Sequence, residues 1–186
     1  MDKKLAKKVL FDTADILERI GLQFFLSDGT CLGAHREGDF IEYDTDMDLK
    51  VKAEDFVPKF PQIRQMVIQA GYRIYKNGSP FSFPNRMKIR TSSLHLDICI
   101  LYLIDGARRL WGSSYCLFWP TSLFDNPKQI DFLGRKFNIP TPVTEYLELT
   151  YGPDYMTPNQ EFSHPESSKC LIDTNRIPGS LRNGRK

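Results

Sequence analysis

The sequence lacks the features that mark metal-ribbon, disulfide-rich and membrane-spanning proteins. Its four cysteines are scattered without a C-x-x-C pair, which disfavours a zinc ribbon and a dense disulfide framework. No apolar run is long enough for a transmembrane helix, and Asp12, Asp15 and Glu18 interrupt the stretch in which a signal peptide needs an apolar core. We therefore expect a reduced, cytoplasmic protein with no integral membrane segment.

The chain also lacks a strong charge excess, an internal repeat and a low-complexity array. A formal charge of +2 over 186 residues is too small to indicate a nucleic-acid or membrane partner. A hydrophobic content of 41% is ordinary for a globular chain, and this length can bury a core without disulfides. We expect a single domain over residues 1–160 and a polar, basic and mobile tail over residues 161–186.

Apolar periodicity and turn residues predict an α+β fold. Helices are expected at 3–20, 30–36 with Thr30 as the cap, 53–70 with interruptions at two prolines, and 142–151. Strands are expected at 23–27, 46–52, 72–75, 82–90, 95–103 and 136–139.

Alternating carboxylates are the strongest chemical feature of the sequence. Asp44, Asp46 and Asp48 precede and enter a predicted strand, where residues two apart project to the same face. Asp97 is a lone acid in a later apolar strand. If the two strands are neighbours, three carboxylates converge, and such a cluster requires a cation to offset repulsion and desolvation.

An all-oxygen ligand set favours Mg²⁺ or Mn²⁺. A calcium loop does not fit, because it requires glycine and glutamate where the chain has Leu49 and Asp55. Cys31 and His35 are one helical turn apart and would make half of a zinc site, but no second pair is evident. We assign Asp46, Asp48 and Asp97 as metal ligands and catalytic residues, with Asp44 as a further ligand or a loop acid.

The order of these motifs resembles the LicD and fukutin-related branch of the nucleotidyltransferase fold. The similar blocks are GTCLGAHR at 29–36, GDFI at 38–41, DTDMD at 44–48, HLD at 95–97 and YLELTYG at 146–152. Where the family usually has Pro-Trp, the chain has Glu42 and Tyr43. The resemblance implies a nucleotidyltransferase-like mixed β-sheet flanked by helices.

The resemblance also implies an activity. A phosphorylated small alcohol, phosphocholine or an alditol phosphate, would pass from a CDP-linked donor to a sugar hydroxyl of a glycan acceptor, with release of CMP. Asp97 would hold a second metal or accept the proton of that hydroxyl. Two alternatives are a nucleotidyltransferase that transfers NMP from an NTP with release of pyrophosphate, and a non-catalytic binding module.

Several residues are candidates for substrate binding. Gly29 would let the backbone approach the donor phosphates, and Thr30 at the helix start would donate an N–H to them; the alternative is an ordinary tight turn. Arg36 is the candidate for a forked phosphate contact, against a surface ion pair with Glu37 or Asp39.

Lys88 and Arg90 alternate on a predicted strand and would face the same cleft, or else form a solvated edge. His95 shares the face of Asp97, although a lone strand histidine is usually a structural hydrogen-bonding residue. Tyr43 is a further substrate-binding candidate. With Tyr115, Trp111 and Trp119 it would form an aromatic cage for choline, unless these rings belong to the core.

Overall fold

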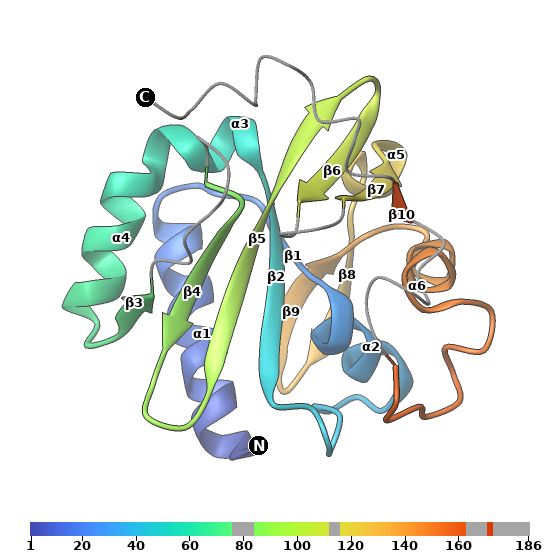
Figure 1. The fold of residues 1–186 in the computed structure, drawn as a ribbon. Helices are drawn as coiled ribbons and strands as arrows, with labels where there is room; N and C mark the ends of the chain where they lie inside the picture. The colour runs from blue at the N-terminus through green and yellow to red at the C-terminus, as the bar shows by residue number, and fades with distance from the viewer. Residues whose placement is uncertain (76–83, 112–115, 163–170, 173–186) are drawn as a thin grey trace.

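The computed structural model describes residues 1–75, 84–111, 116–162 and 171–172 (Figure 1). The helices are α1 (Lys3–Arg19), α2 (Asp28–Arg36), α3 (Ala53–Phe56), the 3₁₀ turn η1 (Val57–Lys59), α4 (Phe60–Gln69), α5 (Ser122–Asp125) and α6 (Val143–Tyr151). The strands are β1 (Phe24–Leu26), β2 (Asp46–Lys52), β3 (Arg73–Tyr75), β4 (Arg86–Arg90), β5 (His95–Ile104), β6 (Ala107–Trp111), β7 (Cys116–Pro120), β8 (Lys128–Phe132), β9 (Arg135–Ile139) and β10 (Leu171–Ile172).

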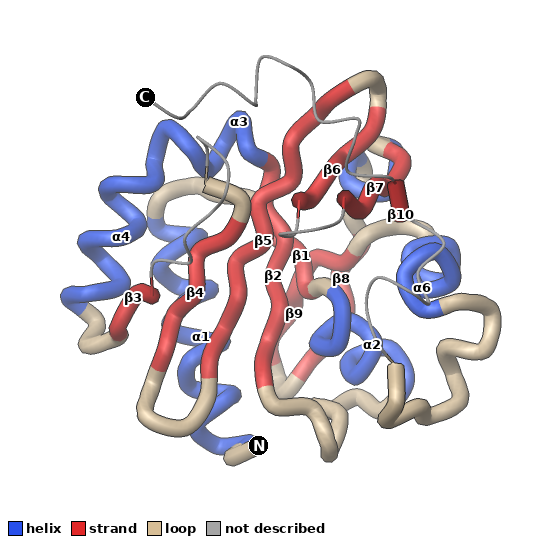
Figure 2. The backbone as a smooth tube through the Cα atoms, in the orientation of Figure 1, coloured by secondary structure: helices blue, strands red, loops and turns tan. Residues whose placement is uncertain are grey.

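A mixed sheet of eight strands forms the centre of the fold, as the backbone trace shows (Figure 2). Its main order is β1-β2-β5-β6-β7-β10, and β4 pairs with the first part of β5 and carries β3 on its outer side. The β2–β5 pair is parallel, whereas the other pairs of this sheet are antiparallel. β8 and β9 form a separate hairpin. The mixed α+β architecture predicted from the sequence is thereby confirmed.

Helix α1 is amphipathic, and its apolar face packs against the hydrophobic core. Its buried positions include Val9, Leu10 and Leu17, each with no exposed surface. Asp2 caps the helix by accepting the backbone N–H groups of Lys4 and Leu5. Helices α1 and α4 pack against each other behind the sheet, whereas α2 and α6 contact each other on the opposite side of the molecule (Figure 1). The acidic ends of β2 and β5 therefore face α2 and not the α1–α4 layer.

The structure confirms the predicted strand at 46–52, and α1 and α6 begin within one residue of their predicted starts. The predicted helix cap at Thr30 is wrong: α2 begins at Asp28 after Ser27, and the Thr30 hydroxyl accepts the backbone N–H of Asp48. β8 was not predicted because few of its residues are apolar. Residues 82–83 of the predicted 82–90 strand and most of the 161–186 tail lie outside the described residues.

Phe137 on β9 joins three elements through aromatic contacts. It is 1% exposed, and its ring centroid lies 5.9 Å from that of Phe11, 6.3 Å from that of Phe24 and 6.2 Å from that of Phe132. We expect Phe137→Ala to lower the free energy of unfolding by about 3–5 kcal/mol, because it leaves a cavity between α1, β1 and the hairpin. Urea unfolding measures this, with Leu103→Ala at a half-exposed position as the control. Equal effects of the two changes would contradict the packing assignment.

Candidate active site

The parallel β2–β5 pair brings the predicted acids together. Asp46 stands opposite His95 in the register, and Asp48 stands opposite Asp97. Since residues two apart on a strand share a face, the three carboxylates lie on one side of the sheet. The convergence that the sequence predicted is confirmed.

His95 is part of this acidic face. Its Nε2 lies 3.0 Å from Asp46 Oδ2. Asp46, His95 and Asp97 each offer a ligand atom, and these atoms lie within 4.8 Å of one another. The histidine thus lies within ion-pair distance of an acid that the sequence assigned to the metal.

Asp97 has two carboxylate oxygens in different surroundings. Oδ2 accepts a hydrogen bond from Arg86 Nη1 at 3.0 Å and lies 3.3 Å from the Lys88 ammonium. Oδ1 is buried and has no hydrogen-bond partner among the described residues. Burial raises the pKa of Asp97, and the positive charges of Arg86 and Lys88 oppose that rise. One oxygen is therefore anchored, while the other retains its capacity to bind a cation or a proton.

Asp44 lies directly against the backbone of Gly29. A Cβ atom at position 29 would stand 2.2 Å from Asp44 Oδ2, and its three nearest neighbours would all be Asp44 atoms. Burial, followed by the nearby charge of Asp46, raises the pKa of Asp44 to about 6. Asp44 Oδ1 also accepts the Thr45 backbone N–H at 2.8 Å. Gly29 thus makes room for an acid of the site, a role that the sequence analysis did not assign.

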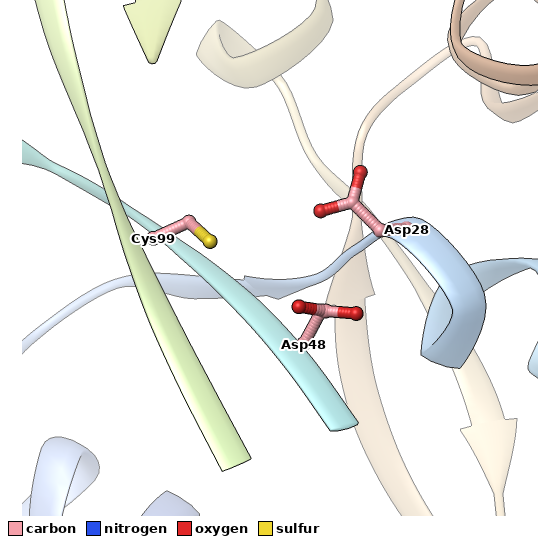
Figure 3. A group of neighbouring side chains, drawn as sticks. All are labelled: Asp28, Asp48 and Cys99. Carbon is pink, nitrogen blue, oxygen red and sulfur yellow. The ribbon is translucent and has the colours of Figure 1, made fainter. Parts of the chain in front are cut away.

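Asp48 has a second carboxylate, Asp28, close to it, as Figure 3 shows together with Cys99. Burial, and then the negative charges of Asp28 and Asp46, raise the pKa of Asp48 well above its ordinary value. Burial also raises the pKa of the Cys99 thiol to about 12, so this thiol keeps its proton at neutral pH. Because Asp28 is bound by Lys50, the group in Figure 3 is not a ready cation site.

Two of the residues predicted to bind phosphate, Thr30 through its backbone N–H and Arg36 through its guanidinium, have side chains that contact the protein itself. Thr30 is 2% exposed and holds the backbone of Asp48, as described above. Arg36 lines the cavity but pairs with Glu37 at 2.6 Å, and its Nη1 donates to the Tyr155 carbonyl oxygen at 3.2 Å. The ion pair considered as the alternative for Arg36 is therefore present.

The remaining residues predicted to bind substrate, Lys88, Arg90 and Tyr43, differ in their surroundings. Lys88 reaches Asp97, whereas Arg90 is exposed and its guanidinium lies 4.8 Å from the centroid of the Tyr75 ring. Tyr43 is 40% exposed and lines the cavity.

The predicted aromatic cage does not form around the cavity within the described part of the chain. Trp111 and Trp119 are at most 2% exposed and pack in the core, and Tyr115 lies outside the described residues.

Asp28, Asp44, Asp46, Asp48 and Asp97 all line a cavity of about 780 Å³. This volume suits a drug-sized or nucleotide-sized ligand. Leu32, Arg36 and Ile41 also line the cavity. The last residue of α6 and the segment that follows it, which we call the C-terminal wall, contribute Tyr151, Pro153, Asp154, Tyr155, Thr157, Pro158, Asn159, Gln160 and Phe162.

Sequence reasoning missed Arg86, Lys50, Asp28, Tyr146 and the wall. Arg86 shares the alternation of Lys88 and Arg90, so the same period-two pattern would have found it. Lys50 likewise shares a face with Asp46 and Asp48. Tyr146 lies in a block quoted for the family resemblance, but no local pattern indicates its contact with residues 28 and 50.

The donor set fits a hard divalent cation. Asp46, Asp48 and Asp97 supply carboxylate oxygens, the ligands that Mg²⁺ and Mn²⁺ prefer, and Asp97 Oδ1 is a buried acceptor that a cation would satisfy. The neighbouring cations Arg86 and Lys88 contact the other oxygen of Asp97. Cys31 and His35 belong to neither group of possible metal ligands found among the described residues.

The mixed sheet and its paired acids define a domain of the nucleotidyltransferase fold. The solution structure of antibiotic-resistance factor ANT(2'')-Ia matches with a TM-score of 0.54 at 14% identity, over 88% of this chain and 79% of that one. The crystal structure of ANT(2'')-Ia in complex with adenylyl-2''-tobramycin matches with a TM-score of 0.52 at 16% identity, over 86% and 83%. At these identities the likeness concerns the fold alone.

Within this fold, the chain belongs to the LicD/FKTN/FKRP family, whose nucleotidyltransferase-domain model matches residues 21–142. Ribitol-5-phosphate transferase FKTN of Mus musculus is 27% identical over 164 residues, 84% of this chain and 34% of that protein. Ribitol 5-phosphate transferase FKRP of Mus musculus is 27% identical over 158 residues, 81% and 31%. The chain thus spans about a third of the length of these relatives. None of the described helices is long and apolar enough to cross a bilayer.

The contact of Gly29 with Asp44 predicts a change of sign in a double-mutant cycle. Gly29→Ala should destabilise the wild-type protein because the new methyl group displaces the Asp44 carboxylate. In an Asp44→Ala background the same change should be neutral or stabilising by up to about 1 kcal/mol, since alanine is the better helix former. Denaturant unfolding of the four proteins measures both steps; equal destabilisation in the two backgrounds would refute the contact.

The raised pKa of Asp44 predicts a pH-dependent effect of Asp44→Asn. Below the ordinary pKa near 3.8 the carboxyl group is protonated in the folded and unfolded states and contributes nothing. As the pH rises toward 6, the unfolded chain ionises first, so the wild-type protein loses stability that the amide variant keeps. Melting temperatures in EDTA should show a variant advantage that grows from pH 4 to pH 8. Asp131→Asn, at an exposed acid on β8, is the control, and a constant advantage of Asp44→Asn over this pH range would contradict the shift.

Proposed function

We propose that the protein is a metal-dependent phosphotransferase of the LicD type. It moves a phosphorylated small alcohol from a CDP-linked donor to a sugar hydroxyl on a glycan and releases CMP. The observation that carries the proposal is the register of β2 with β5, which sets Asp46 and Asp48 beside Asp97 in the lining of a cavity of about 780 Å³. The names of the FKTN and FKRP relatives support phosphotransfer.

Asp46 and Asp48 are the residues that would hold Mg²⁺ or Mn²⁺, with Asp97 and Asp44 next to them. The bound cation would supply positive charge against the donor diphosphate as negative charge develops on the leaving CMP. His95 fixes the Asp46 carboxylate, and the Thr30 hydroxyl fixes the backbone of Asp48. The chain itself thereby orients both ligands before a substrate enters.

Asp97 is suited to act on the acceptor. The acceptor oxygen forms a bond to the phosphorus that carries the small alcohol, the bond from that phosphorus to the CMP oxygen breaks, and the hydroxyl proton leaves. Arg86 and Lys88 hold Asp97 Oδ2, which leaves Oδ1 to accept this proton or to bind a second cation. Arg86 also lines the cavity and adds positive charge near the donor phosphates.

An alditol phosphate is a better candidate for the transferred group than phosphocholine. Recognition of a quaternary ammonium group uses a cage of aromatic rings. Trp111 and Trp119 are buried in the core, so of the described aromatic residues considered for the cage only Tyr43 lines the cavity. The two relatives are named as ribitol phosphate transferases, which makes CDP-ribitol the first donor to test.

Purified protein should release CMP from CDP-ribitol in the presence of Mn²⁺ and a panel of sugar acceptors, with less from CDP-glycerol and CDP-choline. Asp46→Asn, Asp48→Asn and Asp97→Asn should each lower the turnover rate by roughly 10²-fold or more, because each removes charge aimed at the reacting groups. Asp131→Asn, an exposed acid on β8, is the matched control.

Two outcomes would contradict this function. Pyrophosphate release from an NTP, without CMP release from any CDP-linked donor, would identify a nucleotidyltransferase. Unchanged turnover in all three acid variants would reject the site. A thermal-shift assay with each donor adds a binding measurement, since a ligand that binds only the folded state raises its melting temperature.

A further inference from the structure

Lys50 is a fully buried cation next to the acids of the site. It lies on β2, two residues after Asp48 and on the same face, and has no exposed surface. Its ammonium nitrogen is 2.6 Å from Asp28 Oδ1 and 2.9 Å from the Tyr146 hydroxyl oxygen. The Trp119 ring centroid lies 4.5 Å from the same nitrogen. A buried ammonium of this kind requires such a complete set of partners.

Asp28 is the other half of this pair and begins α2. Its φ angle is +44°, in the left-handed region that non-glycine residues seldom adopt, although aspartate tolerates it better than most. The Tyr146 hydroxyl accepts the Asp28 backbone N–H at 3.0 Å and donates to Asp28 Oδ1 at 2.9 Å. Backbone and carboxylate of Asp28 are therefore both held by α6, while Lys50 holds the carboxylate from β2.

This arrangement keeps two charges away from the catalytic acids. Asp28 and Asp48 offer ligand atoms within 4.8 Å of each other (Figure 3), so an unpaired Asp28 would compete for the cation that Asp48 is placed to bind. An unpaired Lys50 would in turn be drawn to Asp48. Their mutual pairing removes both possibilities.

We propose that Lys50 and Tyr146 are positioning residues, which clamp Asp28 and thereby hold the first turn of α2 against β2 and keep Asp28 out of the cation-binding set. The part that concerns catalysis rests on the proposed function. The clamp itself concerns only the folded chain.

The protein offers a matched control for this clamp. Lys8, Asp12 and Tyr72 form the same three-residue arrangement, in which the Lys8 ammonium lies 2.5 Å from Asp12 Oδ2 and the Tyr72 hydroxyl donates to that oxygen. This triad is more exposed and involves α1, away from the acids. Changes to it alter the same kinds of contact without reaching the cavity lining.

The test compares Lys50→Met, the double change Asp28→Asn with Lys50→Met, and Tyr146→Phe with the corresponding changes in the control triad. Mn²⁺ affinity is measured by calorimetry, the first turn of α2 by amide hydrogen exchange, and CMP release by kcat and KM. Lys50→Met should bind Mn²⁺ about fivefold more tightly, because Asp28 is left as an additional carboxylate. The double variant should return to the wild-type affinity.

The double variant and Tyr146→Phe should exchange the amides of residues 28–32 about tenfold faster. Their kcat should fall about tenfold or more with little change in KM, since small displacements of aligned groups reduce the rate strongly. If Lys50→Met does not fold, hydrogen exchange and kcat can still be measured on the double variant, because removing both charges avoids an unpaired buried carboxylate.

Unchanged exchange in the double variant and Tyr146→Phe, together with unchanged Mn²⁺ affinity in Lys50→Met, relative to the control triad, would overturn the clamp and leave Lys50 as a purely structural pair with Asp28. Absence of CMP release by the wild-type protein would reject the proposed function instead. In that case the hydrogen-exchange comparison still decides whether the clamp exists.

Discussion

Crowding of carboxylates at the ends of β2 and β5 is the constraint on which the rest of the site depends. The parallel register places Asp48 opposite Asp97 with Asp46 beside them, and Asp28 and Asp44 approach from the α2 side. Burial and mutual repulsion raise the pKa of Asp44 and Asp48, so the acids favour a proton or a cation over bare charge. The fold reduces this repulsion by placing basic side chains next to Asp28, Asp46 and Asp97.

The basic partners divide the acids into two groups. Lys50 neutralises Asp28 in the interior, while Arg86 and Lys88 anchor one oxygen of Asp97 from the adjacent strand. Asp44 and Asp48 have no such cationic partner among the described ion pairs, and burial together with neighbouring negative charge raises the pKa of both. Basic side chains therefore neutralise some of the acids and not others, and negative charge remains where a divalent cation would bind.

How much of this site could be predicted depends on how far apart in the sequence the interacting residues are. Period-two alternation identifies the face of Asp46 and Asp48, and a lone acid in an apolar strand identifies Asp97, because both signals are local. The role of Lys50 cannot be inferred from its neighbours in the sequence. Charged residues that alternate on a strand usually lie on a solvent-exposed face, and its partner Tyr146 is 96 residues away. Thr30 was assigned as a helix cap because its type suits that position, but the strand next to it uses its hydroxyl instead.

The boundary of the family match separates two parts of the cavity. The matched region, residues 21–142, contains Asp28, Asp44, Asp46, Asp48 and Asp97 with their basic partners, so the charge arrangement on which the proposed phosphoryl transfer depends lies within what the family model covers. Tyr146 and the C-terminal wall follow residue 142, and the wall supplies aromatic rings and side-chain amides to the cavity. Groups of that chemistry stack on and hydrogen-bond to a ligand without taking part in phosphoryl transfer. The wall is accordingly a place to seek selectivity for the proposed donor or acceptor, and Tyr146 connects the region after residue 142 to the acids through Asp28.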